Sequence, residues 1–305
     1  MEQTDNSFLM KPKIDFCFKE LMQNLDVRKG FLAAFLHLTP DEIRETRLLP
    51  THLRKRREEE KLGILDVRIY LNNDTQIDVE IQLSFFKFWE ERSIFYLCKM
   101  YTDQIEAGDE YKTLEKCIHI GILDFELFPE DEEFYSRFHL WEDNRPRLYT
   151  DKLEVHVLEL PKLNKYQYPE TTLLKWARFI NAEKKEELRK MAKTDEYIEK
   201  AYDELVHLSA DQMKRLEYEE REKAIRDYNH QVKCYWEDGV EEGRKRGLEQ
   251  GIKQGKEEGV KEGIEKLGKI ISYLLSQNRM DEIDRVSTDE EYREQLYKEI
   301  QEKSK

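Results

Sequence analysis

The sequence lacks any apolar run close to the roughly 20 residues that a membrane-spanning helix needs. Its start, Met1 to Asp5, is acidic and polar, unlike a secretory signal peptide. Cysteine is scarce, and no two cysteines stand at the Cys-x-x-Cys spacing of zinc sites. We therefore expect a cytoplasmic protein with no membrane partner, in which all the cysteines are free, buried thiols: Cys17, Cys98, Cys117 and Cys234.

Basic residues are also in deficit, with 52 Lys and Arg against 66 Asp and Glu and a net charge of −14. This balance argues against a protein that coats nucleic acid nonspecifically, because phosphate binding needs a basic surface. It leaves room for a local basic groove. One cluster precedes the strands discussed next, and it can equally be a solvated face: Arg44, Arg47, Arg54, Lys55, Arg56 and Arg57.

Acidic residues stand on two neighbouring segments that otherwise look like strands. Residues 77–83 alternate between apolar and polar, which is typical of a half-buried strand, and residues 64–71 nearly do the same. The alternation places Asp78, Glu80 and Gln82 on one face of the predicted strand. Carboxylates at these positions are difficult to explain as packing residues.

The two segments predict a hairpin whose register brings acids together. Residues 72–74, Asn-Asn-Asp, suit a three-residue turn because Asn and Asp tolerate left-handed backbone conformations. The register that fits both patterns places Asp66 opposite Glu80 and Arg68 opposite Asp78. Two carboxylates roughly 5 Å apart repel each other unless a cation lies between them. Mg²⁺ is a suitable ion; the alternative is a pair of acids on a solvent-facing hairpin.

Two flanking helices carry further candidates. Arg92, Tyr96 and Lys99 share one face of a predicted helix, where they could supply a cation to the site or be ordinary surface residues. Asp15 and Lys19 stand one turn apart on an earlier helix, where they could form a structural salt bridge or border the metal site. We treat all five as possible accessory residues.

These residues together resemble a known family. An Asp, a hairpin and then Glu80-x-Gln82 are similar to the PD-(D/E)XK nucleases, and more closely to the PD-(D/E)XK family transposases, or recombination-promoting nucleases, in which Gln replaces the usual Lys. The resemblance extends over residues 10–125, through Lys13 to Lys19 and a set of later positions: Arg92, Tyr96, Gln104, Gly108, Tyr111 and residues 118–123.

The resemblance implies a restriction-endonuclease-like α/β core that binds DNA and hydrolyses phosphodiester bonds with Mg²⁺, or with Mn²⁺ as a substitute. Asp66 and Glu80 would be metal ligands and catalytic residues, and Gln82 would orient the nucleophile. Because Gln lacks a charge, it cannot do everything that Lys does. The alternative function is a catalytically inactive nuclease fold that acts as a protein-interaction module through its helical C-terminal half.

The order of predicted elements indicates an α/β core with a mixed central sheet, followed by an all-α extension. We predict helices over 14–25, 29–38 and 89–107, the last with Ile94 facing inward and Gly108 as its C-cap. Strands are predicted over 116–123, in the middle of the sheet, and over 153–160. The corresponding domains are a nuclease-like core (1–165), a helical extension (166–236), a glycine-repeat segment (237–265) and a helical tail (266–305).

The glycine-repeat segment has a glycine at every fourth position from Gly239 to Gly263, usually followed by an apolar residue. Each glycine inside a helix costs about 1 kcal/mol relative to alanine. The segment is therefore either a solvated tether or a helix whose cost is offset by packing, which favours self-association through the C-terminal region.

Overall fold

The structure is a computed structural model that describes residues 8–53 and 64–303. The chain divides into two units, Met1–Asn229 and His230–Lys305. A 65-residue helix, α7 (Gln212–Ser276), begins in the first unit and continues through the second. Within the described part of the chain, no helix combines the length and the apolar character needed to cross a membrane.

The first unit contains a six-stranded mixed sheet in the order β1-β2-β3-β4-β6-β5. Its strands are β1 (Thr46–Leu49), β2 (Val67–Leu71), β3 (Thr75–Gln82), β4 (Lys116–Leu123), β5 (Tyr135–Trp141) and β6 (Leu148–Glu159). Besides the start of α7, its helices are α1 (Asp15–Leu21), α2 (Leu25–Leu36), α3 (Trp89–Thr102), α4 (Thr172–Asn181), α5 (Lys185–Ala192) and α6 (Glu196–Ala210). The predicted α/β class with a mixed sheet and helical C-terminal region is confirmed.

The predicted hairpin forms in the predicted register. In the β2–β3 pair Arg68 lies opposite Asp78, and Asn72 and Asn73 make the turn with φ of 48° and 60°. β4 takes its predicted central place, parallel to both β3 and β6. Asp66, however, precedes β2 rather than belonging to it, at the position where the same register would continue toward Glu80.

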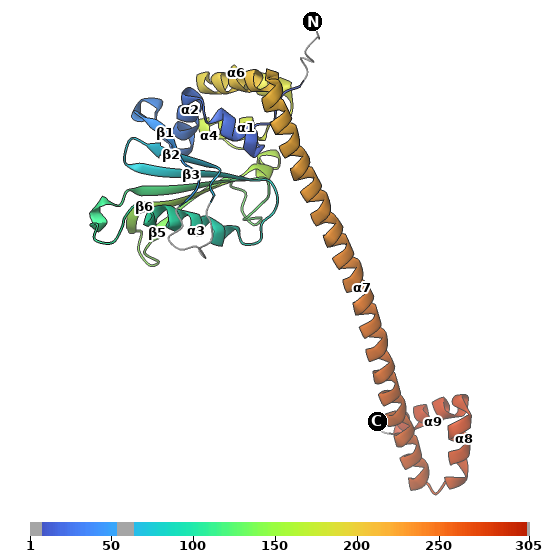
Figure 1. Ribbon diagram of the computed structural model, residues 1–305. Coiled ribbons are helices and arrows are strands. Elements are labelled where there is room, and N and C mark those ends of the chain that lie inside the picture. Colours follow the sequence, from blue (N-terminus) through green and yellow to red (C-terminus); the bar gives the residue numbers. More distant parts are fainter. Residues whose placement is uncertain (1–7, 54–63, 304–305) are drawn as a thin grey trace. The chain divides into compact units, whose positions relative to one another are not determined.

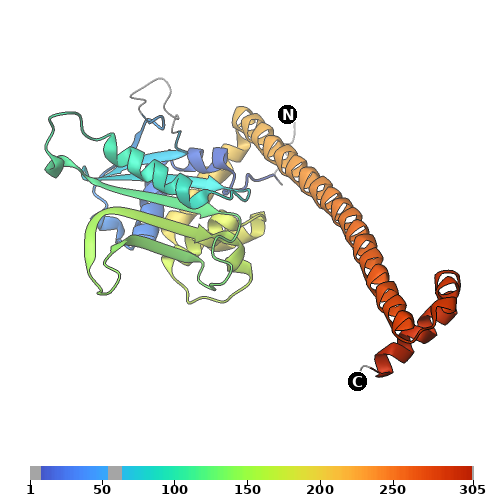
Figure 2. The same cartoon turned by 90° about the horizontal axis from the view of Figure 1, so that it is seen from below.

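Helices cover both faces of the sheet. Figure 1 shows α1, α2, α4 and α6 on one face, where the main core contains Phe31, Phe35 and Trp176. On the other face α3 lies over β4 and β6 (Figure 2). The prediction of a half-buried β3 was therefore wrong, because this second helix layer buries the polar face as well.

Several predicted boundaries and faces were also wrong. The first helix ends at Leu21, and Leu25 starts α2, because the Asn24 side chain accepts hydrogen bonds from the backbone N–H groups of Asp26 and Val27 and caps that helix. α3 ends at Thr102, six residues before Gly108. Ile94 is 49% exposed, because α3 packs through a different face: Trp89, Ser93, Tyr96, Leu97 and Met100.

The edge strand β1 and the other edge strand β5 were missed, and β6 begins five residues earlier than predicted. β5 was missed because its exposed residues include aromatic ones and give no clear alternation. Cys98 and Cys234 are exposed, contrary to prediction, because Cys98 lies on the solvent side of α3 and Cys234 lies where α7 is exposed all round; Cys17 and Cys117 are buried as expected.

The second unit consists of the rest of α7 with α8 (Ile283–Thr288) and α9 (Glu290–Lys303). A small core holds these helices together: Ile270, Leu274, Val286 and Leu296. The glycine repeat is helical inside α7, and a Cβ added at Gly239, Gly251 or Gly263 would meet no described atom within 4 Å. The need for a packing partner stays a prediction, and so does the fourfold division into domains.

Candidate active site

Asp66 and Glu80 come together where β3 approaches its carboxyl end. Glu80 lies on β3 beside Gly121 of β4, on the face covered by α3. The Asp66 carboxylate accepts a hydrogen bond from the backbone N–H of Ile81, at 3.2 Å from Oδ2. This bond holds Asp66 next to Glu80 even though Asp66 lies outside the strand. Both side chains line the same cavity.

Glu80 is 2% exposed and pairs with Arg92. Its Oε2 accepts a hydrogen bond from Arg92 Nη2 at 2.9 Å, whereas its buried Oε1 has no hydrogen-bond partner among the described residues. Burial and the nearby carboxylates of Asp78 and Asp66 raise the pKa of Glu80 to about 8, and Arg92 only partly opposes this rise. Glu80 is thus a carboxylate that a further cation would stabilise.

A buried pair lies next to Glu80 on the same face of β3. The Asp78 Oδ2 and His119 Nδ1 atoms are 2.7 Å apart, and both side chains are at most 1% exposed. Burial, followed by the charge of Asp66, raises the pKa of Asp78, and burial lowers the pKa of His119 to about 4. No role was predicted for His119, although Asp78 was expected on this face. In its ionised form Asp78 raises the pKa of Glu80, whereas His119 opposes this rise.

Gln82 and Arg92 lie together next to Glu80. Gln82 Oε1 accepts a hydrogen bond from Arg92 Nη1 at 3.1 Å, and its Nε2 donates one to the Ser84 carbonyl oxygen at 2.9 Å. Tyr96 is buried, with its ring centroid 5.3 Å from Arg92 Cζ. Lys99 pairs with Asp103, the residue directly after α3, and is not among the described residues that line the cavity.

Helices α1 and α7 supply two more cations. Lys19 Nζ is 2.9 Å from Asp66 Oδ1 and 3.9 Å from Asp15 Oδ2, so this pair borders the site rather than forming an isolated salt bridge. Arg221 of α7 reaches Asp15 with Nη2 at 2.7 Å and Nε at 2.9 Å. Arg221 was not predicted. No local signal identifies it, because 206 positions separate it from Asp15.

The resulting cavity has a volume of about 410 Å³ and lies between the end of β3, α1, α3 and the start of α7. Predicted and unpredicted residues line it: Asp15, Asp66, Glu80, Ile81, Gln82, Leu83, Ser84, Arg92, Arg221, Ala224, Ile225 and Tyr228. Of the predicted basic cluster, Arg54 to Arg57 lie outside the described residues, and the Arg47 guanidinium lies over the Tyr70 ring instead.

The residues fit a hard divalent ion that keeps much of its hydration. The unpaired Oε1 of Glu80 beside Asp66 offers carboxylate oxygens, the ligands that Mg²⁺ prefers. Within the described ranges, no group of three or more His, Cys, Asp or Glu side chains could hold a metal ion. Mg²⁺ needs no such group, because it is commonly bound by one or two carboxylates together with waters and substrate phosphates.

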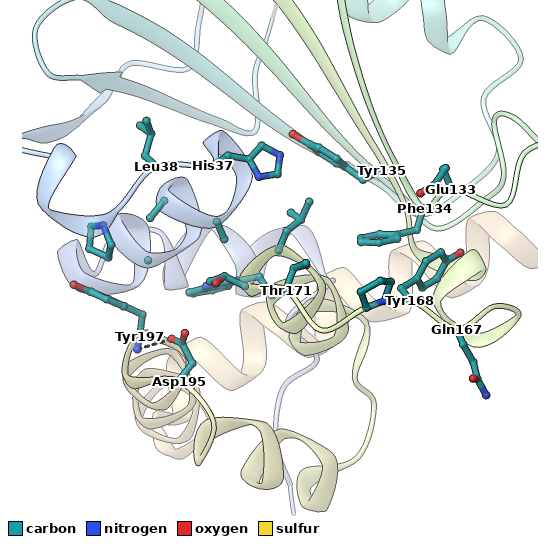
Figure 3. Close-up of a pocket in the computed structure, with 18 of the residues that line it drawn as sticks. His37, Leu38, Glu133, Phe134, Tyr135, Gln167, Tyr168, Thr171, Asp195 and Tyr197 are labelled. Atoms are coloured by element: carbon teal, nitrogen blue, oxygen red, sulfur yellow. Dashed lines mark hydrogen bonds between the residues drawn. The ribbon is translucent and has the colours of Figure 1, made fainter.

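A larger cavity of about 1000 Å³ lies elsewhere in the first unit. Figure 3 shows His37 and Leu38 after α2, Tyr135 on β5, and Asp195 and Tyr197 at the start of α6 around it. Asp195 accepts a hydrogen bond from the Tyr197 backbone N–H and so caps α6. None of the predicted site residues is among the described residues that line this cavity. Size therefore does not identify the candidate active site, whereas its charged groups do.

Comparison with known proteins identifies the family of the chain. The family described as PD-(D/E)XK nuclease family transposase matches residues 12–234, which include the sheet, the candidate site and the helices up to the first part of α7. No curated protein and no solved structure matches the chain. The matched region covers well over half of the sequence and contains Asp66, Glu80 and Gln82. The chain therefore belongs to the PD-(D/E)XK nuclease family transposases.

Proposed function

We propose that the protein is a Mg²⁺-dependent DNA endonuclease that hydrolyses phosphodiester bonds. The observation that carries the proposal is the pairing of Asp66 with the buried, half-satisfied carboxylate of Glu80 in one cavity. A buried carboxylate is costly unless a cation compensates it, so its retention beside a second acid is better explained by metal binding than by stability. Membership of a nuclease family supports the same function.

In this proposal Asp66 and Glu80 hold the metal ion. When bound, Mg²⁺ lowers the pKa of the attacking water and offsets the charge that develops on the phosphate. The hydrogen bond from the Ile81 N–H fixes the Asp66 carboxylate, and the wall of α3 keeps bulk water away from Glu80. Lys19 balances the charge of Asp66 until the metal ion and the DNA phosphate arrive.

Arg92 supplies the positive charge that the lysine of other PD-(D/E)XK nucleases provides and that Gln82 lacks. It contacts both Glu80 and Gln82, so a metal ion on Glu80 would free the guanidinium to bind the scissile phosphate. The Gln82 amide, next to Arg92, then orients the nucleophilic water through its oxygen. Arg221 of α7 lines the same cavity and is placed to bind a neighbouring phosphate of the DNA backbone.

The test is nicking of supercoiled plasmid DNA by the full-length protein with Mg²⁺, with Mn²⁺ and with EDTA. We expect cleavage with either metal and none with EDTA. Asp66→Asn and Glu80→Gln should abolish it, whereas Glu91→Gln, which neutralises an exposed acid on the same helix as Arg92, should not. As a second readout, Mg²⁺ should raise the melting temperature of the wild type but not of Asp66→Asn.

Metal-dependent nicking that survives in Asp66→Asn would contradict the assignment of the site. Absence of any nicking, together with no thermal effect of Mg²⁺, would favour the alternative, a catalytically inactive nuclease fold that acts through protein contacts. One observation favours that alternative: Lys19, Arg92 and Arg221 already pair with the acidic groups of the cavity. We also propose self-association through the C-terminal helical region, which either function can use.

A further inference from the structure

Three phenylalanines are exposed in the loop between β3 and α3, directly after the candidate active site. Phe85 is 67% exposed, Phe86 37% and Phe88 55%. The loop starts at Ser84, which lines the active-site cavity and accepts a hydrogen bond from Gln82. Single exposed apolar residues are common, but three aromatic rings within four positions beside a catalytic cavity indicate a contact surface.

The loop is tied to the site and to the body of the protein. The Phe86 ring centroid is 5.6 Å from Cζ of Arg92, the residue that contacts Glu80 and Gln82. Phe85 packs edge-on against Phe125 with ring centroids 5.3 Å apart. These contacts hold the rings in position next to the cavity. A surface held in position costs a partner less ordering entropy than a loose loop would.

Cationic groups lie beside the rings. Lys87 Nζ lies 5.5 Å from the Phe88 ring centroid, and Arg92 and Arg221 lie in the cavity itself. The acidic residues that follow, Glu90 and Glu91, are in the first turn of α3, where their negative charges interact favourably with the helix dipole. Exposed rings next to cations match a chain of bases and phosphates, because bases stack on aromatic faces and phosphates pair with Lys and Arg.

Only unpaired bases can use such a surface. In a duplex each base is stacked on its neighbours and paired, so its faces are not accessible to a protein ring. We infer that the loop formed by residues 84–88 stacks on unpaired bases, and that single-stranded DNA is the preferred substrate. The cleavage part of this inference rests on the proposed nuclease function, whereas the binding part does not.

The test measures binding separately from cleavage. Full-length Asp66→Asn protein is titrated, by fluorescence anisotropy in Ca²⁺, against a labelled thymine oligonucleotide and against a duplex of equal length. We expect tighter binding of the single strand. Phe85→Leu with Phe88→Leu, which keeps apolar bulk but removes the rings, should weaken single-strand binding about tenfold or more and leave duplex binding nearly unchanged.

The matched control is Phe138→Leu with Trp141→Leu, which removes two exposed rings from β5 at the far edge of the sheet. This pair should leave both affinities unchanged. The inference would be overturned if the protein with both rings bound single-stranded and duplex DNA with equal affinity. It would also be overturned if the variant with Phe85→Leu and Phe88→Leu bound the single strand as tightly as the protein with both rings. A loss of self-association in that variant without a change in DNA binding would overturn it too, because the loop would then be a protein contact.

The two proposals fail in different ways. Metal-dependent nicking without a ring-dependent preference for single strands would leave the nuclease function standing and remove the substrate inference. Ring-dependent binding of single strands without any nicking would remove the nuclease function and leave the inferred binding of unpaired bases standing. Circular dichroism and melting temperature establish that each variant is folded before its binding is compared.

Discussion

At the scale of single residues, the candidate site is an array of balanced charges. Asp15, Asp66 and Glu80 are each matched by a cation from a different helix: Arg221 of α7, Lys19 of α1 and Arg92 of α3. Such pairing offsets part of the cost of keeping carboxylates close together and away from water. A metal ion bound at Oε1 of Glu80 would weaken the attraction between Oε2 and Arg92, so ion binding and release of the guanidinium would be linked.

Whether Arg92 replaces the lysine expected at position 82 can be tested with two variants. Arg92→Ala should lower the cleavage rate by about 10²- to 10³-fold, because it removes a cationic donor aimed at developing charge. Adding Gln82→Lys to that variant should recover part of the loss, since the amide and the guanidinium are neighbours, 3.1 Å apart. Single-turnover cleavage rates provide the measurement. Failure of the double variant to exceed Arg92→Ala would show that the two positions are not interchangeable.

Glu154 is a structural carboxylate outside the site. It is 6% exposed and accepts hydrogen bonds from His156 Nε2 at 2.9 Å, from His139 Nε2 at 2.8 Å and from Lys116. Burial opposes its ionisation, but the hydrogen bonds outweigh burial and hold the pKa of Glu154 well below its ordinary value of 4.5. The ionised form is therefore favoured in the folded state.

Glu154→Gln should lower the free energy of unfolding by about 2–4 kcal/mol at pH 7, because Lys116 and the histidines lose their anionic partner. Because the pKa of Glu154 is lower in the folded state than in the unfolded state, its contribution to stability decreases in acid. The stability from ionised Glu154 is complete above pH 4.5 and is lost as the pH falls toward the folded-state pKa, so the variant and the wild type should converge in acid. Urea unfolding at pH 7 and pH 3.5 measures this; a constant difference would contradict it.

At the scale of elements, the position of α3 depends on one glycine. Gly121 of β4 lies beside Glu80, and a Cβ there would be 2.5 Å from Cζ2 of Trp89, which is 1% exposed and begins α3. The Trp89 ring cannot move away easily, because it is buried between the sheet and α3, the helix that also carries Arg92. The absence of a side chain at Gly121 thus allows α3 to approach the sheet and reach Glu80.

Gly121→Ala should therefore destabilise the fold by about 1–3 kcal/mol through overpacking, and should lower cleavage by displacing Arg92. Adding Trp89→Phe removes the atoms in the way and should restore both properties in part. Thermal unfolding and plasmid nicking are measured for both variants at a temperature where each is folded. If Gly121→Ala keeps full stability and activity, α3 does not depend on this close approach.

At the scale of the whole molecule, the glycine repeat of α7 carries a cost, and a Cβ added at any of its glycines would meet no described atom within 4 Å. The seven glycines of the repeat, from Gly239 to Gly263, cost on the order of 7 kcal/mol relative to alanine. The apolar residues that follow several of them are all at least 51% exposed: Val240, Leu248, Ile252, Val260 and Ile264. A second copy of the segment would bury this row and offset the cost.

Deleting residues 239–265 should leave the first unit folded and metal-binding but weaken self-association, because the exposed row is removed. Sedimentation velocity at several protein concentrations gives the measurement. A second variant keeps the helix length and replaces the five exposed apolar residues with serine. It should weaken association to a similar extent. Association equal to that of the wild type in both proteins would leave the segment as a solvated tether.

The hairpin and the central strand were predictable from the sequence because their information is local. The alternation of residues 77–83 and the Asn-Asn-Asp turn determine the register within about 20 positions, so Arg68 opposite Asp78 could be predicted without a structure. The apolar run of residues 116–123 indicated a central strand for the same reason. The resemblance of Asp66, Glu80 and Gln82 to a family pattern likewise needs only the sequence.

What covers these residues was decided only in the tertiary structure. A period of two shows that Glu80 and Gln82 share a face, but it carries no information on which element packs against that face. The burial of Glu80 under α3, its contact with Arg92 and the pairing of Asp78 with His119 depend on that packing. Arg221 meets Asp15 across 206 positions, because the start of α7 packs beside α1. Local pattern therefore determined the acids and their register, and long-range packing determined their charge partners.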